Sequence, residues 1–443
     1  MKTPIYDFIK KYAQSNSLRM HMPGHKGIGD IEKYDITEIS GADSLYEASG
    51  IIKESENNAS LLFGADTFYS AEGSSLSIRA MLYLVNLFAK SNGRNAKVLA
   101  ARNAHKTFIT AVSLLDIDVE WITPEENESY LSSSLTYEKI EEHFKKSSPL
   151  PDAVYLTSPD YLGKIADIKA ISDVCHKYGV LLLVDNAHGA YLKFLKESMH
   201  PIDLGADMCC DSAHKTLPCL TGAAYLHISK SAPVIFKENA KDALALFGST
   251  SPSYLILSSL DKANEYINGG YKEKLSAFVS SLDGLKNRLI ESGYTLFGNE
   301  PMKLTVYAKP YGYLGTELAE KLAKRGITVE FSDPDFVVLM PTPEISESEL
   351  AMLEEAFLAI EKRSPISSTA PKNALPERAM SPREALLAMS ETIPVEKALG
   401  RTLAAVTVGC PPAVPIIVSG EVIDEKAIEA FLYYGIKEFK VVK

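Results

Sequence analysis

Short β-rich apolar runs alternate with segments of helical apolar spacing from about residue 60 to residue 230. This alternation is typical of a parallel sheet whose two faces are covered by helices, so the sequence predicts an α/β fold. Helices are expected at 76–89 and 168–178, the second ending before Gly179. Strands are expected at 97–101, 118–122, 153–157, 180–185, 208–211 and 223–228.

A second region with a mixed pattern follows residue 253. Apolar runs at 303–308 and 327–331 predict strands, and helical spacing predicts helices at 316–325 and 347–362. A Ser- and Pro-rich stretch then has the composition of a linker. The length of 443 residues suits two to three domains. We expect an N-terminal segment (1–48), a large α/β domain (49–255), a small α+β domain (256–362), the linker (363–382) and a C-terminal domain (383–443).

Composition and missing motifs exclude several functions. The net charge is −11 and no basic patch is segregated, so nucleic acid is not an expected partner. No run approaches a membrane span and the start lacks a signal peptide, which indicates a cytoplasmic protein without membrane association. The five cysteines form no CxxC, and HExxH is missing, so neither a disulfide framework nor a metal site is predicted. GxSxG, GxGxxG and P-loop motifs are also missing, which argues against a hydrolase or nucleotide site.

The most informative stretch for chemistry is Asp211-Ser212-Ala213-His214-Lys215-Thr216, directly after an apolar run. A lysine held just past a strand end is readily desolvated and loses its proton, as Schiff-base chemistry with an aldehyde requires. An earlier apolar run ends at Asp185. Ligands of open α/β sheets bind outside the carboxyl ends of strands, so Asp185 and Lys215 are expected to converge. A carboxylate there keeps a pyridinium nitrogen protonated, which makes pyridoxal phosphate an effective electron sink. A solvated lysine and a helix N-cap aspartate are the ordinary alternatives.

Two further elements fit the same crevice. Gly73, Ser74 and Ser75 immediately precede a predicted helix, and backbone N–H groups with two hydroxyls at a helix N-terminus bind phosphate. His105 lies four residues past the strand at 97–101, where a flat imidazole can stack on a cofactor ring. Both features also have ordinary explanations, because Ser-rich N-caps and hydrogen-bonded loop histidines are common.

With these residues assembled, the chain resembles the ornithine/lysine/arginine decarboxylase family of pyridoxal-phosphate enzymes with the aspartate-aminotransferase-type fold (fold type I). The resemblance covers nearly the whole chain. It implies a mostly parallel seven-stranded sheet in the large domain, a smaller α+β domain and a decarboxylase-type C-terminal domain. The chain begins almost at the first motif and so resembles the short form of the family, without an N-terminal wing. The matching stretches are His21-Met22-Pro23-Gly24-His25-Lys26-Gly27, 101–107, 185–190, 212–218, 249–254, 411–415 and Gly420-Glu421.

The resemblance implies a role for each matching residue. Lys215 forms the Schiff base with pyridoxal phosphate, and Asp185 pairs with the pyridine nitrogen. His105 stacks on the ring with His188 beside it. The residues implied around the phosphate are Gly73, Ser74, Ser75, Ser212 and His214, with Thr250 or Ser251 reaching it from a partner subunit.

Shared active sites of this kind imply a homodimer. Glu330, in Val329-Glu330-Phe331, is the candidate to meet a distal cation of the substrate, and His25 is a second candidate substrate contact. The turn Glu72-Gly73-Ser74-Ser75-Leu76-Ser77 departs from the family, in which Asn more often precedes Gly and another Gly follows the hydroxyl pair. Asn186 also replaces a common acidic residue, and Ala413 replaces a usual glycine.

The implied activity is decarboxylation of a basic L-amino acid (lysine, arginine or ornithine) to CO₂ and a polyamine-type amine. His188, His214 or the freed Lys215 would protonate Cα, and the sequence does not choose among them. Two alternatives stay open. One is another reaction on the same cofactor, such as transamination or a lyase step, because fold does not fix reaction type. The other is a catalytically silent regulatory relative.

Overall fold

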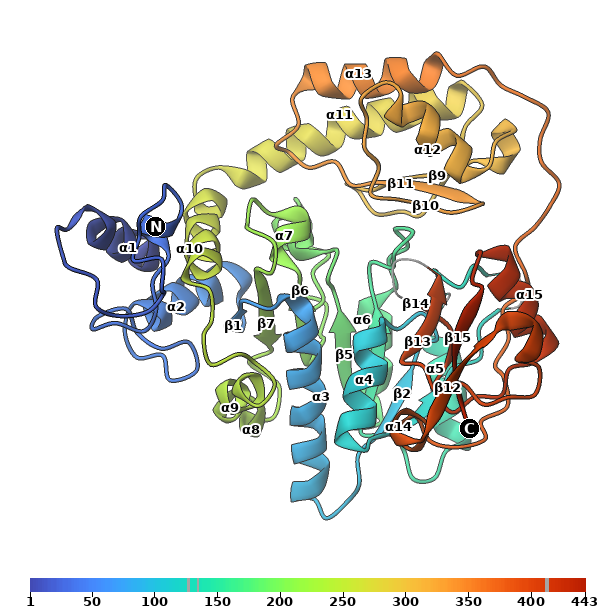
Figure 1. Cartoon of the computed structure of the whole chain (residues 1–443), viewed down its shortest axis with the longest axis horizontal. Coiled ribbons are helices and arrows are strands. Elements are labelled where there is room, and N and C mark those ends of the chain that lie inside the picture. The colour runs from blue at the N-terminus through green and yellow to red at the C-terminus, as the bar shows by residue number, and fades with distance from the viewer. Residues whose placement is uncertain (126–127, 134, 411–413) are drawn as a thin grey trace. The chain divides into compact units, whose positions relative to one another are not determined.

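The computed structural model describes residues 1–125, 128–133, 135–410 and 414–443. Its largest sheet has seven strands in the order β1-β7-β6-β5-β4-β2-β3 and is mostly parallel, which confirms the expected fold class (Figure 1). All six predicted strands of this region are present. The strand bounds are β1 Asp66–Ser70, β2 Lys97–Ala100, β3 Asp118–Trp121, β4 Ala153–Thr157, β5 Leu181–Asp185, β6 Met208–Asp211 and β7 Ala224–Ile228.

Strand β1 was not predicted. It pairs antiparallel with β7, which itself runs antiparallel to β6. Its sequence, Asp-Thr-Phe-Tyr-Ser, has no apolar run. The strand is nevertheless buried, because the side chains of Thr67 and Ser70 form hydrogen bonds inside the protein. A strand whose partner lies far along the chain leaves little local signal.

The chain divides into two compact units. The first comprises Met1–Ala96, Asp152–Val154 and Ile168–Lys274, and the second comprises Lys97–Pro151, Tyr155–Asp167 and Leu275–Lys443. These two units are not the five predicted segments, whose boundaries stay a prediction. None of the helices in the described residues is both long and apolar enough to cross a membrane.

In the first unit, α3 supports the expected ligand site. It begins at Gly73 with a positive φ of 69° and packs against β6 and β7 through a buried face that includes Leu76, Ala80 and Leu84. The i, i+4 spacing of these residues forms the apolar stripe of a helix that lies on a sheet. The other helices are α1 Pro4–Gln14, α2 Ile51–Phe63, α6 Ile168–Lys177, α7 Ala213–Thr216, α8 Val234–Glu238, α9 Ala240–Ala245 and α10 Tyr254–Asn268, with 3₁₀ helices at Glu32–Tyr34 and Ala190–Phe194.

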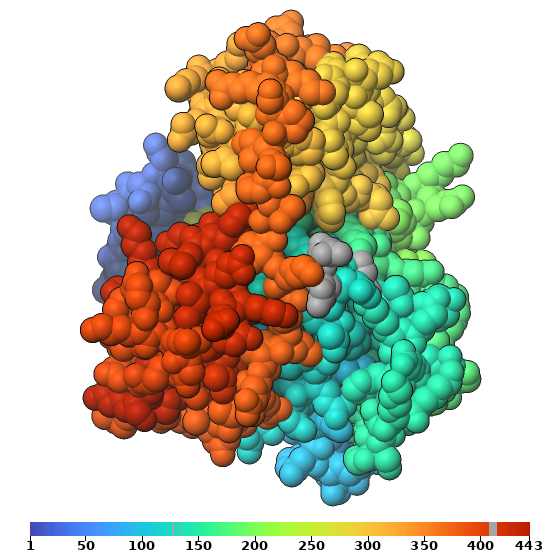
Figure 2. Space-filling model, turned by 90° about the vertical axis from the view of Figure 1, so that its right-hand side faces the viewer, coloured from blue at the N-terminus to red at the C-terminus, as the bar shows by residue number. Residues whose placement is uncertain are grey.

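Helix α11 (Tyr271–Glu291) leads into the rest of the second unit. A four-stranded sheet there has the order β10-β11-β9-β8. Residues 361–377, orange in Figure 2, contain no helix or strand and follow the surface of this unit. The remaining elements are α4 Lys106–Leu115, α5 Tyr137–Lys146, α12 Gly315–Ala323, α13 Glu347–Leu358, α14 Pro382–Leu387, α15 Glu425–Tyr433, β8 Thr295–Phe297, β9 Leu304–Tyr307, β10 Phe331–Ser332, β11 Phe336–Leu339, β12 Ser390–Pro394, β13 Thr407–Cys410, β14 Val414–Val418 and β15 Glu438–Val442, with 3₁₀ helices at Lys309–Tyr311 and Val395–Lys397.

The strand predicted at 327–331 is wrong in all but its last residue. The N–H of Ile327 donates to Leu322 O at the end of α12, after Gly326 has turned the chain with a φ of 79°. This helix-capping bond keeps the β-branched run out of the sheet until Phe331. The unpredicted strand β11 pairs instead with β9 and β10.

Candidate active site

The predicted Schiff-base lysine lies one turn past the end of a sheet strand. Strand β6 ends at Asp211, and the short helix α7 carries Lys215. Strand β5 runs parallel to β6, so the segments that follow the two strands leave the same edge of the sheet. Lys215 Nζ lies 3.0 Å from Nε2 of His188, which is 5% exposed. The structure therefore brings these two predicted residues into direct contact.

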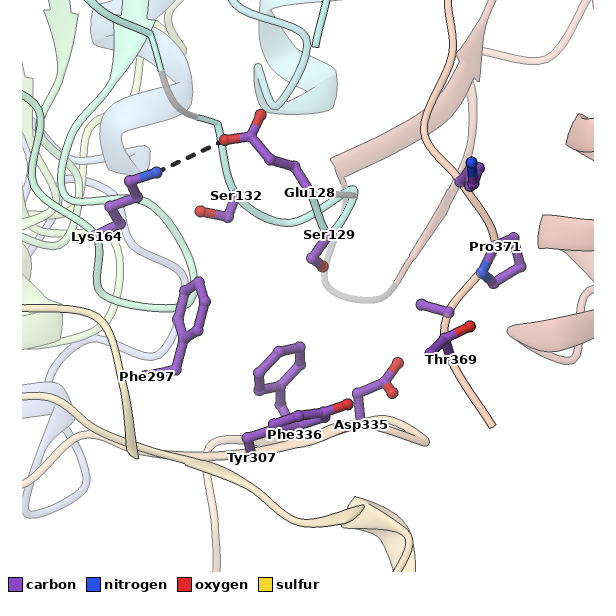
Figure 3. Close-up of a pocket in the computed structure, with 12 residues that line it drawn as sticks. Glu128, Ser129, Ser132, Lys164, Phe297, Tyr307, Asp335, Phe336, Thr369 and Pro371 are labelled. Atoms are coloured by element: carbon purple, nitrogen blue, oxygen red, sulfur yellow. Dashed lines mark ion pairs between the residues drawn. The ribbon is translucent and has the colours of Figure 1, made fainter. Parts of the chain in front are cut away.

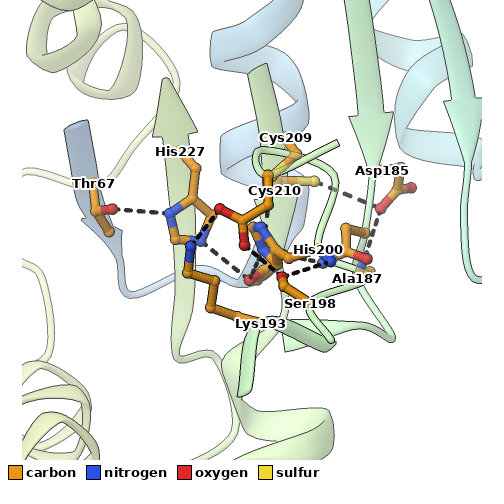
Figure 4. A network of polar contacts seen from close by, with 12 residues as sticks. Thr67, Asp185, Ala187, Lys193, Ser198, His200, Cys209, Cys210 and His227 are labelled. Atoms are coloured by element: carbon orange, nitrogen blue, oxygen red, sulfur yellow. Dashed lines mark hydrogen bonds and ion pairs between the residues drawn. The ribbon is translucent and has the colours of Figure 1, made fainter. Parts of the chain in front are cut away.

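Asp185 is the last residue of β5 and is 2% exposed. Its Oδ1 accepts hydrogen bonds from Ala187 N (3.2 Å) and from the Cys210 thiol (3.6 Å), as Figure 4 shows. Burial and the Asp185 carboxylate raise the pKa of Cys210 well above its usual range, so this thiol stays a neutral donor. A buried carboxylate held at a strand end is the group that a protonated pyridine nitrogen needs.

The predicted phosphate residues meet at the N-terminus of α3. Ser212 Oγ donates to Ser74 Oγ at 2.8 Å, which joins the α7 segment to the first turn of α3. Among the described residues, no atom beyond the immediate neighbours and the backbone of α3 lies within 4 Å of the position that a Cβ on Gly73 would take, so this turn faces open space. Glu72, at the family's Asn position, accepts a 2.5 Å hydrogen bond from Ser249 N and so holds the loop that leads to Thr250 and Ser251.

Pyridoxal phosphate fits this donor set. The lysine amine beside His188 matches the cofactor aldehyde, and the buried carboxylate at the strand end matches the pyridine nitrogen. The two hydroxyls beside the glycine turn match the phosphate. All of these groups belong to the first unit.

Removal of the Ser74 and Ser212 hydroxyls, which are predicted to hold the cofactor phosphate, is expected to weaken cofactor binding. In a Ser74→Ala/Ser212→Ala double variant, the dissociation constant for pyridoxal phosphate should rise about 100-fold, because each of the two lost bonds to a charged group costs on the order of 1.5 kcal/mol. Titration of the apoprotein by absorbance measures it. Ser198→Ala is the matched control, because it removes a half-buried hydroxyl that bonds Asp203 and His200 N and is not among the proposed cofactor groups. Unchanged affinity in the double variant would contradict the assignment.

His214 is not well suited to donate a proton. Its imidazole is half-buried and hydrogen-bonded at Nδ1 to Ala223 O (2.9 Å). Burial lowers its pKa and the Lys215 charge lowers it further, although the bond to the Ala223 carbonyl opposes both effects. At neutral pH the ring is therefore uncharged.

The other predicted residues have well-defined local partners. His105 caps α4, where its Nδ1 accepts a hydrogen bond from Thr107 N (3.2 Å). Glu330 Oε1 accepts from the Tyr161 hydroxyl (3.1 Å), and burial together with this carboxylate raises the pKa of Tyr161. Both belong to the second unit, so their place beside Lys215 stays a prediction. His25, in the N-terminal segment, lies 3.2 Å from Asp35 Oδ2.

A buried polar network behind Asp185 was not predicted (Figure 4). The fully buried Asp211 accepts hydrogen bonds from His200 Nε2 and His227 Nε2, both at 3.1 Å, and from Asn186 Nδ2 at 2.7 Å. Burial raises the pKa of Asp211, but the two imidazoles outweigh this and hold it well below its usual range. The network explains the departure at Asn186, because an acidic residue there would face the Asp211 carboxylate.

His200, Cys209 and Asp211 also place potential metal ligands within 4.8 Å of one another. Hydrogen bonds to the two imidazoles and to Asn186 account for the position of the Asp211 carboxylate. Burial, reinforced by the Asp211 charge, raises the pKa of the Cys209 thiol, which disfavours the thiolate that metals bind.

We expect Asp211→Asn to destabilise the protein by about 3 kcal/mol, because breaking a buried charged network leaves its partners uncompensated. Denaturant unfolding followed by circular dichroism measures this. Because the folded-state pKa of Asp211 is depressed, its stabilisation is complete above about pH 4 and declines as the pH falls further. Wild type should therefore lose more stability on acidification than the variant. Asp173→Asn, in an exposed pair with Lys169, is the control, and equal losses in both variants would contradict the prediction.

A separate cavity of about 520 Å³ lies within the second unit (Figure 3). Phe297, Tyr307 and Phe336 form an aromatic wall, and Glu128 Oε1 lies 3.6 Å from Lys164 Nζ on the other side. None of the predicted cofactor residues lines this cavity.

Comparison with known proteins gives the class. The family model "Orn/Lys/Arg decarboxylase, major domain" matches residues 3–290, and the C-terminal domain model of the same family matches residues 367–439. The chain belongs to this family, so it is a pyridoxal-phosphate-dependent decarboxylase. Residues 411–413 of the family's C-terminal motif lie outside the described residues.

Individual proteins agree with this class. The chain is 30% identical to arginine decarboxylase of Bacillus subtilis, over 96% of this chain and 92% of the relative. It is also 30% identical to arginine decarboxylase of Halalkalibacterium halodurans, over 96% of this chain and 91% of that one. The fold is similar to that of a lysine decarboxylase of Francisella novicida, with a TM-score of 0.81 at 18% identity over 100% of this chain and 81% of the other.

Proposed function

We propose that this protein releases CO₂ from the α-carboxylate of a basic L-amino acid, with arginine as the preferred substrate. The observation that carries the proposal is the contact between Lys215 Nζ and His188 Nε2 at the same sheet edge as Asp185. Arginine ranks first because two relatives similar over nearly their whole length are arginine decarboxylases. A lysine decarboxylase of Pseudomonas aeruginosa is 22% identical over 60% of this chain.

Each residue of the site would hold one part of the cofactor. Lys215 would bind its aldehyde carbon, Asp185 would face the pyridine nitrogen, and Ser74 with Ser212 would hold the phosphate at the α3 N-terminus. When bound, pyridoxal phosphate supplies an electron sink for the electron pair that stays on Cα when CO₂ leaves. Asp185 keeps that sink effective because its buried charge favours a protonated nitrogen.

His188 and Lys215 are the groups best placed to move the proton that Cα receives. Their nitrogens are 3.0 Å apart, so a proton passes between them along one hydrogen bond. His214 is set aside as the donor, because burial keeps its ring neutral and its Nδ1 is engaged by Ala223 O.

The decisive test is CO₂ release from L-arginine, L-lysine and L-ornithine by purified protein loaded with pyridoxal phosphate. We expect CO₂ release from at least one of these amino acids, fastest from arginine, and no keto-acid formation. Keto-acid formation without CO₂ would indicate transamination. Cofactor binding without any turnover would support a regulatory relative instead.

We further propose a cytoplasmic homodimer. Thr250 and Ser251 are exposed beside the α3 turn, consistent with a role toward a second copy. Light scattering on the holoprotein tests this, and a monomer at assay concentrations would contradict it.

A further inference from the structure

The loop that carries His105 is connected to the C-terminal part of the second unit by a buried ion pair. Arg102, three residues before His105, is 2% exposed, and its Nη2 lies 2.6 Å from Glu421 Oε2. Glu421 is 3% exposed, and the same oxygen accepts a 2.7 Å hydrogen bond from Val418 N. The carboxylate is therefore held by its own segment as well as by the arginine.

This ion pair has the properties of a positioning contact. Two charges withdrawn from water lose much of their mutual attraction to desolvation, so a buried pair adds little stability while it fixes geometry. Arg102 Nε and Nη1 have no hydrogen-bond partner among the described residues, and the guanidinium lies 5.0 Å from the centre of the Trp121 ring. The fold thus retains an incompletely satisfied cation at the base of the His105 loop.

The same C-terminal segment also holds the far end of α4. Arg383, in α14, donates from Nη1 to Ser113 O (3.0 Å) and Leu114 O (2.9 Å), the last carbonyls of α4. A cation at this position satisfies carbonyls that have no partner within the helix. Both α14 and β14 pack against α4 (Figure 1).

The orientation of the His105 ring depends on α4. Its Nδ1 accepts from Thr107 N in the first turn of that helix and lies 2.9 Å from Thr107 Oγ1. Any shift of α4 or of the Arg102 backbone would therefore move the imidazole.

We propose that residues 378–410 and 414–443, the C-terminal clamp, position His105 for catalysis, with Glu421 and Arg102 as positioning residues. The inference rests on the proposed function and on the stacking of His105 on the cofactor ring that the family resemblance implies. It gives the C-terminal domain a role in the reaction although Glu421 contacts no reacting atom.

The test uses the holoenzyme with Glu421→Gln, which removes the charge and keeps the size. We expect kcat to fall about tenfold or more, because small misplacements of a positioned group are costly, while KM changes little. The visible circular dichroism of the bound cofactor should change as well. In a His105→Ala background, the same substitution should cost less than about twofold, since residues that act through one another are non-additive.

Glu391→Gln is the control, because it removes the exposed pair with Arg401 in the same C-terminal segment. If Glu421→Gln does not fold, Arg383→Gln, whose side chain is 41% exposed, tests the far end of α4 with the same two readouts. Equal losses with and without His105, or unchanged circular dichroism and kcat, would overturn the clamp. A wild-type enzyme that binds cofactor without decarboxylating would refute the proposed function, and the circular dichroism of the variants would still decide the role of the clamp.

Discussion

Replacing Lys215 with alanine is expected to reduce decarboxylation by about 1,000-fold or more. The substitution removes the amine that we propose attaches the cofactor and also the partner of His188 Nε2. Covalent attachment and proton transfer would thus depend on the same side chain, so the loss of rate cannot be divided into one part for each. CO₂ release under saturating substrate and cofactor measures the effect.

Lys169→Ala is the matched control for this experiment, because Lys169 lies on the exposed face of α6 in an ion pair with Asp173. It should keep wild-type activity. Turnover by Lys215→Ala within tenfold of wild type would sink the assignment. Reductive trapping with borohydride provides an independent check, since only proteins that retain Lys215 should bind the cofactor covalently.

The second large effect is expected from Asp185→Asn. The amide keeps the shape of the side chain and removes the charge that we propose faces the pyridine nitrogen, so kcat should fall on the order of 100- to 1,000-fold. Cofactor binding should weaken much less, because the hydroxyls of Ser74 and Ser212, which we propose hold the cofactor phosphate, are unchanged. A cofactor analogue that carries a fixed positive charge at the ring nitrogen should restore part of the rate.

Recovery with that analogue distinguishes lost electrostatics from lost folding, since a misfolded site would not respond to it. Asp207→Asn is a poor control, because Asp207 bonds Leu182 N and His176, so its replacement would also disturb the fold. Asp203→Asn, whose carboxylate pairs with Lys193 at the surface, is the better control. Full activity of Asp185→Asn with the natural cofactor would contradict the role assigned to this carboxylate.

Local pattern was sufficient to predict much of the sheet. The apolar runs that end at Asp185 and Asp211 predicted two strands of a mostly parallel sheet. These strands are parallel neighbours in the structure, so the residues that follow them leave the same edge. The Lys215–His188 contact follows from that arrangement.

Features that depend on distant partners were not predictable in the same way. His227 comes from β7 and His200 from a loop, so no spacing along the chain marked the network around Asp211. The ion pair between Arg102 and Glu421 joins residues more than 300 positions apart. Strand-like composition at 327–331 was misleading because a helix-capping bond determined the local backbone.

The hydrogen bond between Thr107 N and His105 Nδ1 has an electrostatic consequence. A ring nitrogen that accepts from a backbone N–H carries no proton, so the tautomer is fixed with the proton on Nε2 and the imidazole is uncharged. A neutral ring stacks on a protonated pyridine without the repulsion that two cations face to face would suffer. The first turn of α4 therefore selects the charge state of His105 that is compatible with a positively charged aromatic neighbour.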